Sequence, residues 1–92
     1  MDPILQIPIR IIKEQELVIG PLAWDEAQKV TGLNIDQSHN SVSFTGDAKD
    51  IINRLVAQYE RIFGKASHAV CHDAVKDLIT GMSPAEVPSS LK

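Results

Sequence analysis

The sequence predicts an α+β domain in which a small, mainly antiparallel sheet of three or four short strands is covered by a C-terminal antiparallel helical hairpin and one short helix. Two amphipathic segments, 47–63 and 67–80, are joined by a short link, which predicts the helical hairpin. Short apolar runs predict the strands, at 4–12, 17–19, 33–35 and 41–45. Most links between these runs are too short for a parallel crossover, so antiparallel pairing is expected.

The N-terminal segment 4–12 is expected to be a strand. Its isoleucines recur at every second position from Ile7 to Ile11, and isoleucine is β-branched and favours extended backbone. Pro8 has no N–H to donate to a sheet, so this strand is expected to lie at an edge or to have its Pro8 side unpaired. The run 17–19 is close enough to pair with it as a first hairpin.

The middle of the chain predicts a short helix and then a second hairpin. Pro21 suits the first position of a helix, and Asp25 and Glu26 follow in the first turn, where negative charge is favoured. Residues 22–32 are therefore expected to be helical. The two strands that follow are separated by turn-forming residues at 36–40.

The segment 47–63 carries the clearest helical pattern, because its apolar residues recur at spacings of three and four. Asp47 is placed to cap its start and Gly64 to end it. The segment 67–80 has a second apolar stripe, with Ser67 as its expected cap. The side chains of the first helix that we expect in the core are Ile52, Leu55, Tyr59 and Ile62.

Residues 1–81 are expected to form one domain and residues 82–92 a mobile C-terminal tail. Gly81 ends the last long helical pattern, and Pro88 limits any helix that begins after it. A chain of 92 residues has a small core, and self-association is a common way for such a domain to bury more surface.

Composition argues against several functional classes. The net charge is −3 and the basic residues are scattered, so no footprint for nucleic acid is present. The single cysteine, Cys71, cannot form an internal disulfide. The sequence has no apolar run long enough to span a membrane and no signal-peptide pattern, so a cytoplasmic location is expected.

The most suggestive chemical cluster is His68, Cys71 and His72. His68 and His72 are four residues apart and share a helix face, so they can bind one metal ion. Cys71 points away from His72 toward the apolar stripe, so the three do not converge easily. The competing interpretation is a buried cysteine beside two boundary histidines, and on it no cofactor is expected.

No catalytic residue is identified by the pattern. Cys71 lies near a helix start and beside His72, which is mildly consistent with a nucleophile, but its position in the apolar stripe favours an inert, buried thiol. Thr45, Gly46 and Asp47 lack the glycines of a phosphate-binding loop, so Asp47 is interpreted as a cap.

Two functional hypotheses follow. The first is a small cytoplasmic protein-interaction or regulatory module that forms a homodimer or binds a partner protein and is not an enzyme. Ile4, Ile12 and Val18 form the expected apolar surface on the N-terminal strands, which would make the contact. The second is a protein that binds a metal or a small ligand through His68, Cys71 and His72.

Overall fold

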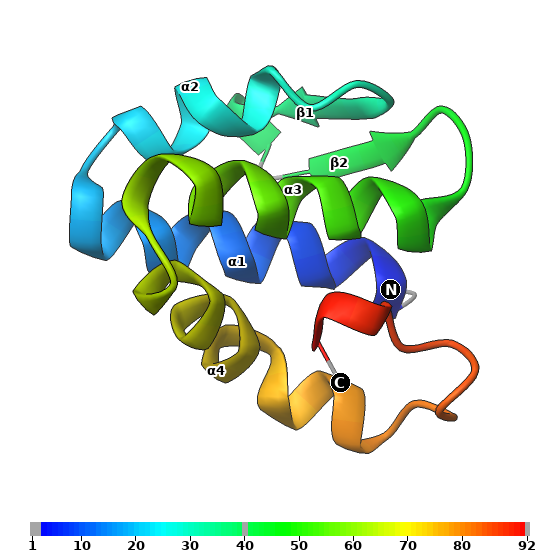
Figure 1. Cartoon of the computed structure of the whole chain (residues 1–92). Helices are drawn as coiled ribbons and strands as arrows, with labels where there is room; N and C mark the ends of the chain where they lie inside the picture. Colours follow the sequence, from blue (N-terminus) through cyan, green and yellow to red (C-terminus); the bar gives the residue numbers. More distant parts are fainter. Residues whose placement is uncertain (1–2, 40, 92) are drawn as a thin grey trace.

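The computed structural model describes residues 3–39 and 41–91, which form an α+β fold (Figure 1). Asn40 of the predicted turn and Lys92 of the predicted tail lie outside the described residues. The elements in chain order are α1 (Pro3–Ile19), α2 (Leu22–Gln28), β1 (Leu33–Asp36), η1 (Gln37–His39), β2 (Ser41–Phe44), α3 (Ala48–Phe63), α4 (Ala66–Thr80) and η2 (Ser89–Leu91).

The two predicted N-terminal strands are wrong, because residues 3–19 form the helix α1. The buried positions of α1 are Ile7, Pro8, Ile11, Ile12 and Gln15, which follow the helical spacing of three and four. The isoleucines at every second position from Ile7 to Ile11 also fit the period of a strand, and this concealed the helical spacing. Pro8 lies inside the helix rather than on an edge strand, and its own ring is buried against the core.

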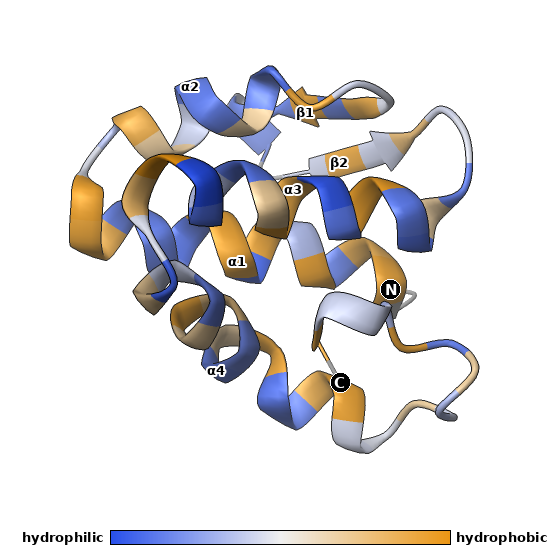
Figure 2. Cartoon of the chain, in the orientation of Figure 1, coloured by the Kyte–Doolittle hydropathy of each residue, from blue (hydrophilic) through white to orange (hydrophobic). Residues whose placement is uncertain are grey.

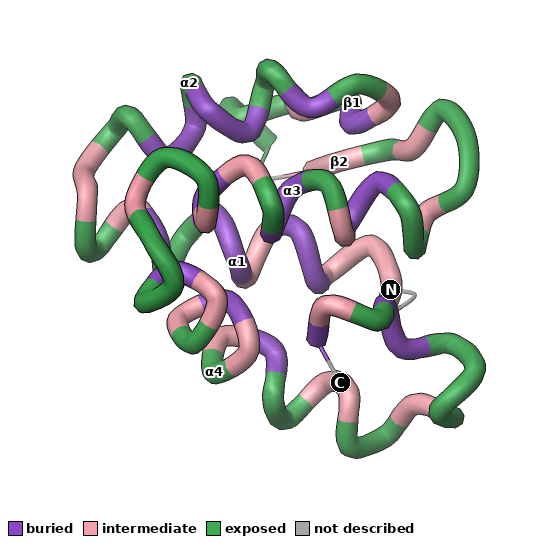
Figure 3. Tube along the Cα trace, in the orientation of Figure 1, coloured by how far each residue is buried: buried purple, intermediate pink, exposed green. Residues whose placement is uncertain are grey.

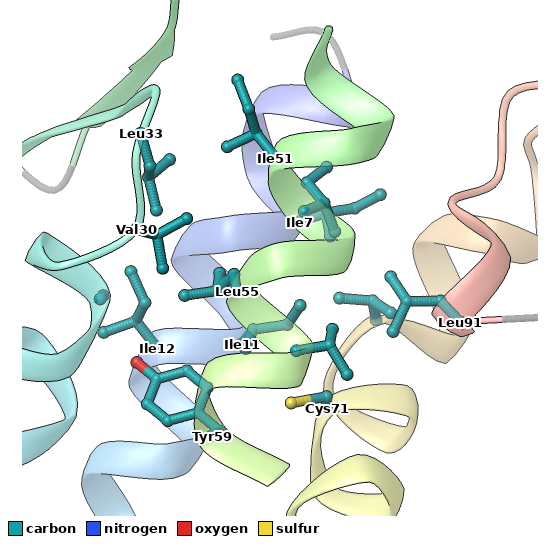
Figure 4. Packing of buried hydrophobic residues seen from close by; sticks show 14 of the residues in the cluster. Ile7, Ile11, Ile12, Val30, Leu33, Ile51, Leu55, Tyr59, Cys71 and Leu91 are labelled. Atoms are coloured by element: carbon teal, nitrogen blue, oxygen red, sulfur yellow. The ribbon is translucent and has the colours of Figure 1, made fainter. Parts of the chain in front are cut away.

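Helix α1 is the element around which the others pack. It contacts α2, α3, α4 and β2, and its most extensive contact is with α4. Figure 1 shows α1 running behind α3, with α4 crossing below and the strands above. Figure 4 shows Ile7, Ile11 and Ile12 within the cluster of buried side chains. The core therefore lies between helices and is not one face of a sheet.

The second predicted hairpin is confirmed. β1 and β2 pair antiparallel, with Leu33 opposite Phe44 and Asp36 opposite Ser41. Within the described residues the sheet has these two strands only, so the predicted sheet of three or four strands is wrong. The preceding helix is also shorter than expected, since α2 ends at Gln28 and a turn leads to β1.

Helices α3 and α4 occupy nearly the predicted residues. Ile52, Leu55 and Tyr59 are fully buried, as expected, but Ile62 is 42% exposed and that assignment is wrong. Asp47 stands at the N-cap of α3, although its side chain makes no capping hydrogen bond. The structure does not have the predicted helical hairpin packed over a sheet, because α4 packs mainly on α1.

The residues after α4 return to the core. Residues 83–86 are exposed, but Val87 and Pro88 are buried and Leu91 is fully buried (Figure 3). In Figure 4 the Leu91 side chain points from this segment toward the cluster. The boundary at residue 81 stays a prediction, and the segment predicted to be a tail contributes buried side chains to the core.

Two polar side chains join α3 to α2. The Tyr59 hydroxyl donates a hydrogen bond of 2.6 Å to the backbone oxygen of Ala23, and burial raises the pKa of Tyr59. Glu26 is buried and accepts hydrogen bonds from Lys29 Nζ at 3.0 Å and from Gln58 Nε2 at 2.9 Å. These bonds, that of Lys29 first, lower the pKa of Glu26 below its ordinary 4.5.

Gly32 is required where the hairpin meets α3. Its φ is +90°, and a Cβ there would lie 2.8 Å from the Thr45 backbone oxygen and 2.9 Å from Cδ1 of Ile51. The Gly32 carbonyl also accepts a 2.8 Å hydrogen bond from the Thr45 N–H. Gly20 is a matched control, because its φ is +75° and a Cβ would meet nothing within 4 Å.

We expect Gly32→Ala to lower the free energy of unfolding by about 2 kcal/mol or more, because backbone strain and crowding add. Gly20→Ala should cost only about 1 kcal/mol, since only the strain applies. Urea unfolding followed by circular dichroism measures both. Equal losses in the two variants would show that the approach to Thr45 and Ile51 is not tight.

Glu26 should make part of the stability depend on pH. Because its folded-state pKa is lowered, its contribution is complete above the unfolded value of 4.5 and is lost as the pH falls through the folded value. Glu26→Gln should therefore be less stable than the parent at about pH 7, with the difference narrowing toward about pH 3. Melting temperatures across this range measure it, with the exposed neighbour Asp25→Asn as control. A constant difference at every pH would contradict the role of charge.

Candidate functional site

His68 lies half exposed on the first turns of α4 and contacts two other segments. Its Nδ1 is 3.2 Å from a carboxylate oxygen of Glu60 on α3, and its Nε2 donates to the backbone oxygen of Ser90. Both ring nitrogens therefore face oxygen acceptors within the chain. A metal ion at His68 would have to displace one of these contacts.

Cys71 lies on the side of α4 that faces the core and is fully buried, as its position in the apolar stripe predicts. Figure 4 shows its sulfur within the core cluster. Gln15 of α1 donates to Cys71 Sγ at 3.4 Å and to the Ser67 backbone oxygen at 3.1 Å. Burial raises the pKa of the Cys71 thiol to about 11, partly offset by the Gln15 hydrogen bond, so the thiol stays protonated at neutral pH.

The three predicted site residues do not converge. His72 is partly exposed and its Nδ1 lies 3.7 Å from the carboxylate of its neighbour Asp73, while Cys71 faces the core. Among residues 3–39 and 41–91, no group of three histidine, cysteine or carboxylate side chains is placed to hold a metal ion. His68 and His72 share one face of α4, but the described residues bring no third ligand of that kind to them.

The turn before β2 contains a second cluster. Asp36 accepts from the Ser38 hydroxyl at 2.7 Å and contacts His39 Nδ1 at 2.7 Å, and these bonds, that of Ser38 first, lower the pKa of Asp36. Ser38 Oγ also lies 3.2 Å from the same His39 nitrogen. A catalytic triad needs the serine and the acid on different ring nitrogens. This exposed cluster therefore closes a turn, which agrees with the turn chemistry of the sequence.

Trp24 is held against the end of α1. Its Nε1 donates a 2.7 Å hydrogen bond to Glu16, and the ring is buried. Beside it is an open hollow of about 430 Å³ whose walls include Lys13, Glu16 and Leu17. This places a depression between α1 and α2 near the end of α1.

Large apolar side chains are exposed at the same end of the molecule. Within the described residues, those that are both large and exposed are Leu17 at 80%, Val18 at 66%, Leu22 at 44% and Ile62 at 42%. They come from the end of α1, the start of α2 and the end of α3, which lie together at the left of Figure 1. The hydrogen bond between Tyr59 and Ala23 holds α3 and α2 together here. We call this set the apolar patch.

The patch differs from the apolar surface expected on N-terminal strands. Ile12 is fully buried and Ile4 is packed partly against the core, so only Val18 of the three expected residues is strongly exposed. Figure 2 shows hydrophobic colouring at the end of α1 and at the start of α2. Helical spacing from Ile7 to Gln15 leaves Leu17 outside the buried stripe, which is a signal that could have identified this part of the patch.

No family model, characterised protein or solved structure matches this chain.

We expect Cys71 to react with a thiol reagent at least about a hundredfold more slowly in the native protein than in denaturant, because the sulfur is buried and its pKa is raised. Absorbance with a chromogenic disulfide reagent at about pH 8 measures the rate. The chain has one cysteine, so the signal has one source. Native labelling as fast as that of the denatured chain would overturn the buried assignment.

Proposed function

We propose that this chain is a small protein-interaction module that forms a homodimer through the apolar patch. The exposure of Leu17 and Val18 carries the proposal, because adjacent, strongly exposed aliphatic side chains at the end of a structured helix are costly in water. A second copy is the partner that this surface favours. The hollow beside Leu17 and Trp24 gives an incoming side chain a depression to enter.

The charges around the patch suit self-association. Lys13 and Glu14 precede the patch residues of α1 by about one helical turn, Asp25 follows Leu22 by three residues, and Arg61 adjoins Ile62. All four charged side chains are exposed. A two-fold contact brings a surface onto its own copy, so a rim with both signs of charge can meet its complement.

A cytoplasmic location is part of this proposal. The cysteine is a free, buried thiol, which suits a reducing compartment. None of the helices in the described part of the chain has the length and hydrophobicity needed to cross a membrane.

Sedimentation equilibrium over a wide range of concentrations tests the dimer. The parent chain should approach twice the monomer mass at high concentration, and Leu17→Ser with Val18→Ser should weaken association by about tenfold or more, because two central apolar side chains are lost. Lys76→Ser, an exposed change on α4, is the control and should leave association unchanged. A parent chain that is monomeric at every concentration would defeat the homodimer.

The alternative proposal is a metal or small ligand bound through His68 and His72, with Cys71 excluded by its burial. One observation favours it: both histidines are partly exposed and lie four residues apart on one face of α4.

If this alternative holds, Zn²⁺ in about tenfold excess should raise the melting temperature by several degrees, and His72→Ala should abolish the rise. His39→Ala, which removes the remaining histidine of the sequence, is the control for binding at His39 and should leave the rise unchanged. An unchanged melting temperature would reject the alternative.

A further inference from the structure

We infer that Tyr59, Glu16 and Trp24 are positioning residues of the proposed dimer contact. Two hydrogen bonds, one from Tyr59 to α2 and one from Trp24 of α2 to α1, fix α2 between its neighbours and so hold Leu22 in one surface with the rest of the apolar patch. The inference rests on the homodimer proposed above and names the residues that set the shape of its contact surface.

The short helix α2 needs contacts outside itself to keep its place. It has seven residues, and no side chain caps its start. A helix of this length is not stable alone. Leu22 at its first position is 44% exposed and belongs to the apolar patch, whereas the next two residues, Ala23 and Trp24, are buried. The residues that place the patch side chain of α2 are therefore those that contact Ala23 and Trp24.

Tyr59 joins α3 to α2 close to the patch. Its hydroxyl donates a hydrogen bond of 2.6 Å to the backbone oxygen of Ala23, and Figure 4 shows the hydroxyl oxygen pointing toward α2. Ala23 is next to Leu22, and Tyr59 precedes Ile62 by three residues on α3. One bond therefore joins the two helices within three residues of a patch side chain on each. Tyr59 is 0% exposed, so it cannot touch a partner itself.

Trp24 joins α2 to α1 in the same way. Its Nε1 donates a hydrogen bond of 2.7 Å to a carboxylate oxygen of Glu16. Glu16 precedes Leu17 on α1, and Trp24 follows Leu22 by two residues. A hydrogen bond to a carboxylate is stronger than one between neutral groups. The bond from Trp24 therefore sets the position of Leu22 relative to Leu17.

The patch depends on this positioning because its side chains come from three helices. A surface whose side chains already lie in the bound arrangement loses less freedom on association, and this preorganisation increases affinity. A two-fold contact contains every residue of the patch twice, so an error in the position of α2 affects both halves of the contact. Loss of either hydrogen bond should therefore weaken the dimer even though no patch side chain is removed.

Tyr59→Phe is the sharpest test, because it removes the hydroxyl, keeps the ring and alters no surface atom. We expect it to weaken association about fivefold or more, measured by sedimentation equilibrium on chains whose circular dichroism shows them to be folded. Val75→Ala is the matched control, since it is also a change at a fully buried residue but lies on α4, which contributes nothing to the patch. It should lower the melting temperature and leave association unchanged.

Two substitutions of Glu16 test the second bond. Glu16→Ala removes the acceptor and should also weaken association about fivefold or more, whereas Glu16→Gln keeps an oxygen in its place and should restore association to within about twofold of the parent. The chain has one tryptophan, so its indole N–H gives a single nuclear magnetic resonance signal that shows in each variant whether the bond is present. Glu16 is partly exposed, so these variants should fold even if Tyr59→Phe does not.

A double-mutant cycle shows whether the bonds act through Leu22, the patch residue of α2. In a Leu22→Ala chain no patch side chain is left on α2 to position, so Tyr59→Phe and Glu16→Ala should each change its dissociation constant by less than about twofold. An undiminished loss of affinity in the Leu22→Ala chain would overturn the inference, because the bonds would then not act through the position of Leu22.

The outcomes separate this inference from the homodimer. A parent chain that associates, while its folded Tyr59→Phe or Glu16→Ala variant associates equally well, would overturn the positioning role and leave the homodimer intact. A parent chain that is monomeric at every concentration would reject both, since there would be no contact to position.

Discussion

The burial of one stripe of α1 is the constraint on which the rest of the structure depends. Ile7, Ile11, Ile12 and Gln15 of this stripe are almost completely excluded from solvent, and each neighbouring element covers part of it. The two-stranded sheet is too small to provide a core of its own. α2, α3 and α4 all contact α1, and α3 also packs extensively on α4, so the contacts to α1 together with the contact between α3 and α4 set where these helices lie.

The polar contacts of this stripe determine the position of α4 on α1. Gln15 is the one polar side chain among the stripe residues, and it spans to the Ser67 carbonyl and the Cys71 sulfur of α4. A buried amide is tolerated only with partners, so the register of α4 on α1 is specified at this point. Arg10 and Asp77 make an exposed ion pair of 3.0 Å further along the same contact, which adds little by comparison.

The sequence alone predicted the elements in which the hydrophobic spacing and the residue types favour the same secondary structure. In α3 the helical spacing and the residue types point the same way, and the hairpin of β1 and β2 is bounded by clear turn residues. In α1 they conflict, because β-branched isoleucine favours strands while the buried positions follow a helical period. Tertiary burial decided the outcome, and no local pattern reports how much burial each alternative would gain.

The same limit applies to the functional surfaces. The burial of Cys71 could be predicted, because a helical stripe places it facing the core. The contacts of His68 with Glu60 and Ser90 join segments far apart in the sequence, and no spacing rule anticipates them. Leu91 follows two serines near a proline, which is the composition of a loop, yet its side chain is completely buried. A single apolar residue in a polar segment has no periodicity. Only the contacts of η2 with α3 and α4 show that Leu91 belongs to the core.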